Sequence, residues 1–175
     1  MNENTPGLGR RLGGYLIDWY LSTMLCGGVL VFANSVETGV AAMDSSLPGG
    51  GRGLLLGTLA CLLGVCYYVL FPLLWKGQTP AKRLLGMRIV SADGRAPGLG
   101  ALLLRQLVGG ILLEGAILFP SQLLREMVAM RGFPAVAEGL RVAAVITFLS
   151  VSMAVFVPGR RMLHDRIAST RVIAV

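Results

Sequence analysis

The stretch of residues 54–74 carries no charged side chain and consists largely of Leu, Val, Gly, Cys and aromatic residues. As one helix, at a rise of about 1.5 Å per residue, it covers the ~30 Å hydrocarbon core of a bilayer. Across the 175 residues of the chain, 54% are hydrophobic and only 14% are charged, which supplies too little polar surface for a soluble domain. The sequence therefore predicts an all-α membrane protein.

Three further apolar runs, at about residues 12–33, 99–119 and 140–157, are candidates for the same role. The first run could also belong to a secretory signal peptide, because a basic pair precedes it. Its length, and the presence of Asp18 within it, favour a spanning helix. We expect about four transmembrane helices in a single domain covering residues 1–175.

Small residues recur at helical spacing beside and within the second run, at Gly53, Gly57, Ala60 and Gly64. Such a stripe lets another helix approach closely in a membrane.

Residues 121–132 place apolar side chains on one side of a helix and Arg125, Glu126 and Arg131 on the other. This pattern predicts an amphipathic helix at the membrane interface.

Basic residues are distributed unevenly between the two sides of the predicted membrane. The N-terminal segment, residues 76–105 and the tail at 158–175 together hold twelve of the sixteen Lys and Arg. Because basic loops stay in the cytoplasm, both termini are predicted to be cytoplasmic. The net charge of +7 then predicts contact with anionic lipid, whereas no basic stretch with exposed aromatic residues points to nucleic acid.

The basic segment at 76–98 contains a short amphipathic helix around Pro80, followed by the β-like run MRIVS and a turn at Asp93 and Gly94. A second β-branched run, TRVIAV, ends the chain. We expect these two runs to pair as a small sheet under the membrane.

Asp18 is the most unusual residue of the first apolar run, since a carboxylate in a membrane costs about 2.5–3.5 kcal/mol unless it finds a partner. Arg11, Tyr15 and Asp18 share one face of a helix, so Arg11 or Arg10 is the expected partner. The pair is either a structural anchor or a cation or proton site.

His164 and Asp165 adjoin each other in the basic tail. They could relay protons near neutral pH or simply order the tail. One histidine does not make a metal site, and the three cysteines lie inside apolar runs with no ligand spacing. We expect no metal, no cofactor and no catalytic residues, and hence no enzyme.

Three stretches, GRRLGGYLIDWYL, KGQTPAKRLLGMRIVSADG and RRMLHDRIASTRVI, resemble those of the RDD family of small bacterial membrane proteins. The family is named for an arginine and two aspartates, which the resemblance places at Arg10 or Arg11, at Asp18 and at Asp165. The further family-motif residues are Lys82, His164 and Arg171. The resemblance implies a bacterial inner-membrane protein with a transport function, and sodium/proton exchange is proposed for some members of the family.

Two functions follow as hypotheses. The first is cation or proton transport through Asp18, with Glu114 in the third apolar run as a second site. The four predicted helices show no evident inverted repeat, and they are few for alternating access by one chain. We therefore expect a homo-oligomer with the path between subunits. The alternative is a scaffold or assembly subunit that binds anionic lipid or a partner membrane protein, with the motif residues bracing the fold.

Overall fold

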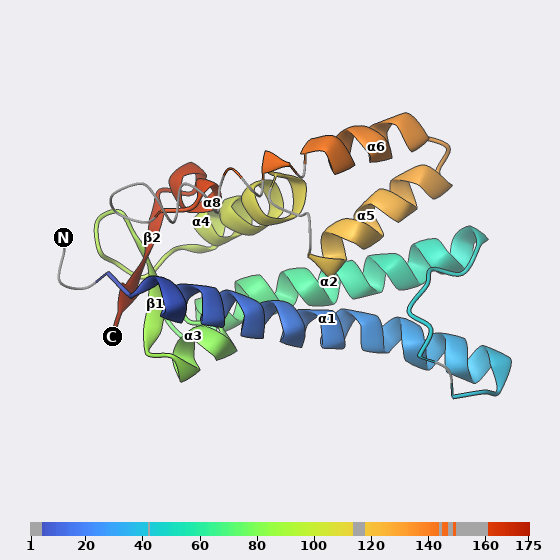
Figure 1. Cartoon of the computed structure of the whole chain (residues 1–175), viewed down its shortest axis with the longest axis horizontal. Coiled ribbons are helices and arrows are strands. Elements are labelled where there is room, and N and C mark those ends of the chain that lie inside the picture. The colour runs from blue at the N-terminus through green and yellow to red at the C-terminus, as the bar shows by residue number, and fades with distance from the viewer. Residues whose placement is uncertain (1–4, 42, 114–117, 144, 147–148, 150–160) are drawn as a thin grey trace.

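The computed structural model describes residues 5–41, 43–113, 118–143, 145–146, 149 and 161–175. It is mostly helical, and the short elements gather at the end where α1 begins and α2 ends (Figure 1). The elements in chain order are α1 (Leu8–Thr38), α2 (Gly50–Leu74), α3 (Pro80–Leu84), β1 (Met87–Ser91), α4 (Leu99–Leu103), the π-helix η1 (Leu104–Leu113), α5 (Phe119–Met130), α6 (Pro134–Ala143), α8 (Leu163–Ile167) and β2 (Thr170–Ala174).

The helices α1 and α2 are long and apolar enough to cross a membrane. They pack side by side in opposite directions (Figure 1), around a core formed by Cys26, Leu30 and Ala60 with Leu123 of α5. Their outward leucines are exposed, as lipid-facing side chains would be. The helix α1 extends beyond the predicted range 12–33 at both ends. The helix α2 begins before the predicted residue 54 and ends at residue 74 as predicted.

The stripe of small residues on α2 is where α5 packs. A Cβ atom added to Gly64 would lie 2.5 Å from Cγ of Pro120, and one added to Gly57 would lie 2.7 Å from Sδ of Met127. The predicted close approach of another helix is thus confirmed. The amphipathic helix predicted at 121–132 lies within α5, and its apolar side, with Leu123 fully buried, faces α2 and α1.

We expect Gly64→Ala to destabilise the protein by about 1–3 kcal/mol, since the added methyl group overpacks the contact between α2 and α5. Gly28→Ala in α1 is the matched control: nothing lies within 4 Å of its Cβ position, so the better helix propensity of alanine should stabilise it by about 0.5–1 kcal/mol. Thermal unfolding in detergent would compare the two. Equal effects at both positions would contradict the close packing.

The third and fourth apolar runs differ from the predicted helices. Residues 99–119 do not form one α-helix: α4 passes directly into η1, and Phe119 with Pro120 begins α5 instead of ending the run. Proline suits this place because the first turn of a helix needs no amide proton there. Only the start of the predicted helix at 140–157 can be compared, in α6, since most of that run lies outside the described residues.

The expected sheet is confirmed. Strands β1 and β2 pair antiparallel, with Met87 opposite Ala174 and Ser91 opposite Thr170. Met87, Ile89 and Val172 form a small buried cluster. The turn before α3 depends on Gly77, which has a φ of +97° and whose Cβ would collide with the carbonyl of Ile89. Only glycine fits this backbone.

Candidate functional site

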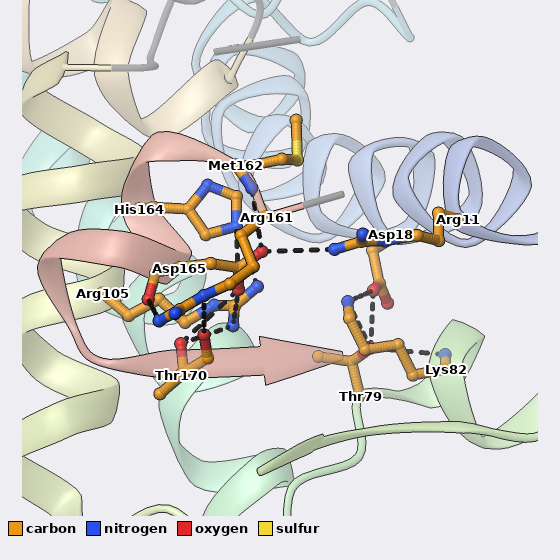
Figure 2. A network of polar contacts seen from close by, with 10 residues as sticks. All are labelled: Arg11, Asp18, Thr79, Lys82, Arg105, Arg161, Met162, His164, Asp165 and Thr170. Atoms are coloured by element: carbon orange, nitrogen blue, oxygen red, sulfur yellow. Dashed lines mark hydrogen bonds and ion pairs between the residues drawn. The ribbon is translucent and has the colours of Figure 1, made fainter. Parts of the chain in front are cut away.

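Asp18 of α1 is buried and lies opposite the loop that leads into α3 (Figure 2). Its Oδ2 accepts hydrogen bonds from Oγ1 of Thr79 at 2.5 Å and from Nζ of Lys82 at 2.8 Å. Its Oδ1 accepts from the Tyr67 hydroxyl at 2.8 Å and from the amide of Ala81 at 3.3 Å. We call these five residues the Asp18 centre; it binds α1 to α2 and α3.

The local sequence explains why these donors converge. Thr79 is the N-cap of α3, so its hydroxyl accepts from the backbone amide of Lys82 while it donates to Asp18. Pro80 begins the helix, and the amide of Ala81, which has no partner inside the helix, turns to the carboxylate. One short capped turn therefore supplies three of the four donors.

The predicted pairing of Asp18 with Arg11 or Arg10 is wrong. The partner of Asp18 is Lys82, whereas Nη2 of Arg11 lies 3.2 Å from Oδ2 of Asp165. Arg10 is exposed. Helical spacing brings Arg11 and Asp18 to one face of α1, but residues distant in sequence offer both side chains better partners.

Asp165 is the second buried carboxylate, and Figure 2 shows it among basic side chains from other elements. Nη1 of Arg105 in η1 lies 2.6 Å from its Oδ1, and Oδ2 also accepts from the amide of Met162. The hydroxyl of Thr170 completes the set at 3.5 Å. These five residues, Arg11 included, form the Asp165 centre, which joins α1, η1, α8 and β2.

His164 contacts Arg105, and its Nε2 also lies 3.8 Å from Oδ1 of Asp165. Its Nε2 lies 2.8 Å from Nη2 of Arg105. Because a guanidinium can only donate, Nε2 must accept and carries no proton in this arrangement. A proton relay from His164 to Asp165 would need that nitrogen to be protonated, so the geometry favours a role in ordering the tail.

The charge state of Asp165 follows from its neighbours. Complete burial by itself raises the pKa of a carboxyl, but the guanidiniums of Arg105 and Arg11 outweigh it and hold the pKa of Asp165 below its usual range. The carboxylate is therefore charged at neutral pH.

A cavity of about 50 Å³ separates the two centres, with room for a few water molecules. Lys82 reaches it from one centre and Arg105 from the other. Its polar lining consists of Tyr15, Tyr68, Thr79, Lys82, Arg105, Gln106 and His164. The π-helix contributes two of these residues, in keeping with the frequent use of such helices at functional sites.

The sequence model of the RDD family matches residues 5–169. This chain belongs to the RDD family. No curated protein and no solved structure matches it. Of the residues that match the family's name, Arg11 pairs with Asp165 and Asp18 pairs with Lys82. Both ion pairs are buried at one end of the helices.

Two of the predicted residues, Glu114 and Arg171, remain to be placed. Glu114 lies outside the described residues. Arg171 lies in β2 opposite Val90. Within the described ranges no group of three or more His, Cys, Asp or Glu could hold a metal.

Sequence reasoning did not identify Tyr67, Thr79, Lys82 and Arg105 as partners of the two aspartates. Tyr67 and Thr79 are neutral hydroxyl residues with no spacing that ties them to Asp18. Lys82 was visible only as a motif residue. Arg105 had a usable signal, since an arginine within an apolar run needs an acidic partner, but nothing in the sequence identifies Asp165 as that partner.

Proposed function

We propose that this RDD protein exchanges a small cation for a proton, with Asp18 as the cation ligand and Lys82 as the proton carrier. The observation that carries the proposal is the position of the Lys82 ammonium, 2.8 Å from Oδ2 of Asp18 and 3.3 Å from Oγ1 of Thr79. In this arrangement the ammonium occupies the place that a bound cation would take.

The chemistry of the ligands supports this reading. The carboxylate of Asp18 and the hydroxyls of Thr79 and Tyr67 are oxygen ligands, which hard cations prefer. Lysine can lose its proton when it leaves a carboxylate in a buried site, whereas arginine cannot. With Lys82 as the partner of Asp18, exchange is therefore chemically simpler than it would be with Arg11.

The exchange step conserves charge. A cation such as sodium displaces the ammonium from Asp18, and Lys82 releases one proton to water in the adjoining cavity. The centre is neutral before the step, as carboxylate and ammonium, and neutral after it, as carboxylate and sodium with a neutral amine. Neutrality at both stages avoids the cost of an unpaired buried charge.

We further propose a four-crossing topology in the bacterial inner membrane, with both termini cytoplasmic. The third crossing would use α4, η1 and α5 in series, and α6 would begin the fourth. The position of α5 along the half of α2 from Gly64 to Gly53 supports this path. The exposed leucines of α2 would face lipid or a second copy in a homo-oligomer, and the basic cytoplasmic end would contact anionic lipid.

The test uses proteoliposomes that enclose a pH-sensitive dye. A pulse of sodium or potassium should move protons in wild-type vesicles and not in Asp18→Asn vesicles. Because Asp18→Asn leaves Lys82 without its carboxylate, the double variant Asp18→Asn with Lys82→Met provides a neutral pair that should fold and still give no flux. Exposed Asp93→Asn is the control with normal flux. Folded wild-type protein that moves no protons under any cation would overturn the proposal.

A scaffold role remains the second candidate, and one observation favours it. Four donors already satisfy both oxygens of Asp18, which is what a purely structural anchor needs. If Asp18 is only an anchor, the double variant Asp18→Asn with Lys82→Met would leave every activity of the protein unchanged. Purification from native membranes would yield a stoichiometric partner protein in place of a partner-free oligomer with flux.

A further inference from the structure

We infer that one face of the small sheet binds the phosphate of an anionic phospholipid headgroup, with Arg88 and Arg171 as its ligands. The inference rests on the proposed placement of this end of α1 and α2 at the cytoplasmic membrane surface, and it is independent of cation exchange. It depends on three observations: two arginines on one face, their unused hydrogen-bond donors, and the level of the sheet along α1.

Arg88 of β1 and Arg171 of β2 lie on the same face of the sheet. Arg88 is opposite Ile173, and Arg171 is opposite Val90, so the alternation of side chains places all four on one face with the arginines diagonally across it. The other face carries the buried cluster of the sheet. Long side chains reach each other across such a diagonal, so both guanidiniums can donate to one phosphate.

Both arginines keep donors without a partner. Nε of Arg88 and Nε of Arg171 are buried, and neither has a hydrogen-bond partner among the residues that the structure describes. No carboxylate of the described residues forms an ion pair with either side chain, whereas Arg11 and Arg105 both pair with Asp165. Leaving such donors unpaired is costly, and a bound ion or ligand is one way to satisfy them.

The two side chains can reach a ligand at the surface. Each is only partly buried, so a turn about its side-chain torsions brings the edge formed by Nε and one Nη outward. This edge is the one through which a guanidinium donates two parallel hydrogen bonds to a phosphate. Binding would therefore give both buried Nε atoms the partner that they lack.

The start of α1 adds positive charge beside the sheet (Figure 1). Arg10, in the first turn of α1, places Nη2 3.6 Å from the position of a Cβ atom added to Gly86, the residue before β1. That turn contains no acidic residue, so the positive end of the helix dipole is not neutralised there. The end of the sheet therefore attracts anions.

The sheet lies at the level of α1 where headgroups would meet acyl chains. Met87 of β1 packs on α1 so closely that a Cβ atom added to Gly14 would lie 2.7 Å from its Cε. On the same turns of α1, Leu12 and Leu16 are 40% and 55% exposed, as side chains in contact with acyl chains would be. A phospholipid with its acyl chains against these turns has its phosphate at the level of the sheet.

The charge of the site selects the lipid. The choline group of phosphatidylcholine would bring a further positive charge to a basic face, whereas the glycerol group of phosphatidylglycerol brings none. A soluble phosphate ester offers the same phosphate but has no acyl chains to contact α1. The chemical class that fits best is a phospholipid with an anionic headgroup.

The experiment uses native mass spectrometry of the full chain in nonionic detergent, with phosphatidylglycerol and phosphatidylcholine of identical acyl chains in competition. Wild-type protein should bind the first phosphatidylglycerol about tenfold more tightly. Glycerol phosphate should displace it only at a large excess. Equal binding of the two lipids, or displacement by equimolar glycerol phosphate, would overturn the inference.

Variants then locate the site. Arg88→Gln with Arg171→Gln should weaken phosphatidylglycerol binding about tenfold. The matched control, Lys76→Gln with Arg95→Gln, removes two exposed charges from the same end of the molecule and should weaken binding less than about threefold. Equal weakening by both pairs would mean diffuse attraction and would overturn the site.

Two further measurements separate this site from other roles. Without lipid, the Arg88 and Arg171 double variant should unfold at the wild-type temperature or above it, since it loses two buried donors that lack partners; a large fall in Tm would instead show a structural pair and contradict the inference. Sodium-dependent proton release should be unchanged in that variant, so a failure of lipid binding is distinguishable from a failure of cation exchange.

Discussion

Asp165→Asn should destabilise the protein by about 3–5 kcal/mol. Asp165 is fully buried, and its carboxylate is the common partner of Arg11 and Arg105. Removing one member of a buried ion pair leaves the other charges in a poorly solvated place, and this costs more than the pair itself contributes. In a chain of this length the Tm should fall by roughly 6–20 °C.

The matched control is Asp93→Asn, since Asp93 is exposed and its carboxylate lies 3.7 Å from Arg95. Surface pairs contribute about 1 kcal/mol or less, so its Tm should hardly change. If both variants unfolded at the same temperature, the Asp165 centre would not hold the fold together.

Acid should reveal the same ion pairs in the wild-type protein. The pKa of Asp165 is lower in the folded chain than the ~3.9 of an unfolded aspartate, so the folded state binds fewer protons. Its stabilising contribution is complete above that unfolded value and is lost as pH falls through the folded pKa. Wild-type stability should therefore decline more steeply below about pH 4 than that of Asp165→Asn.

Lys82→Arg should abolish cation/proton exchange while the protein stays folded. Arginine retains the positive charge and can pair with Asp18, so the buried carboxylate keeps its partner. The guanidinium does not release a proton at any accessible pH, and the exchange step therefore cannot occur. In proteoliposomes the dye response to sodium should fall to that of empty vesicles.

The control for Lys82→Arg is Lys76→Arg, because Lys76 is exposed and lies outside both centres. It should keep the wild-type rate. Full exchange by folded Lys82→Arg protein would exclude Lys82 as the proton carrier.

The elements that sequence predicts well are those with strong local patterns. Hydropathy alone locates α1 and α2, and the β-branched runs predict that β1 pairs with β2. The same reasoning does not predict that α5 packs on α2, since an amphipathic pattern is equally suited to a bilayer surface and to the flank of α2. It also fails at η1, because the widening of a helix to the π form leaves no signal in a run of apolar residues.

The site shows a similar division. Composition and the family motifs identify Asp18 and Asp165 as the residues that need partners, yet local spacing selects Arg11 for the wrong carboxylate. Ion pairs between distant segments depend on how α3 and η1 pack against α1, and helical periodicity contains no information on that packing. The cavity is likewise formed only when both centres are assembled.

The central claim is that a cation takes the place of the Lys82 ammonium at Asp18 and that the amine then loses its proton. Proton release on addition of sodium, followed with a pH electrode in a nearly unbuffered detergent solution, tests this step without any membrane. We predict about one proton released per sodium bound by wild-type protein, and none by Lys82→Arg. Sodium binding to the wild-type protein without proton release, or no sodium binding at all, would contradict the account.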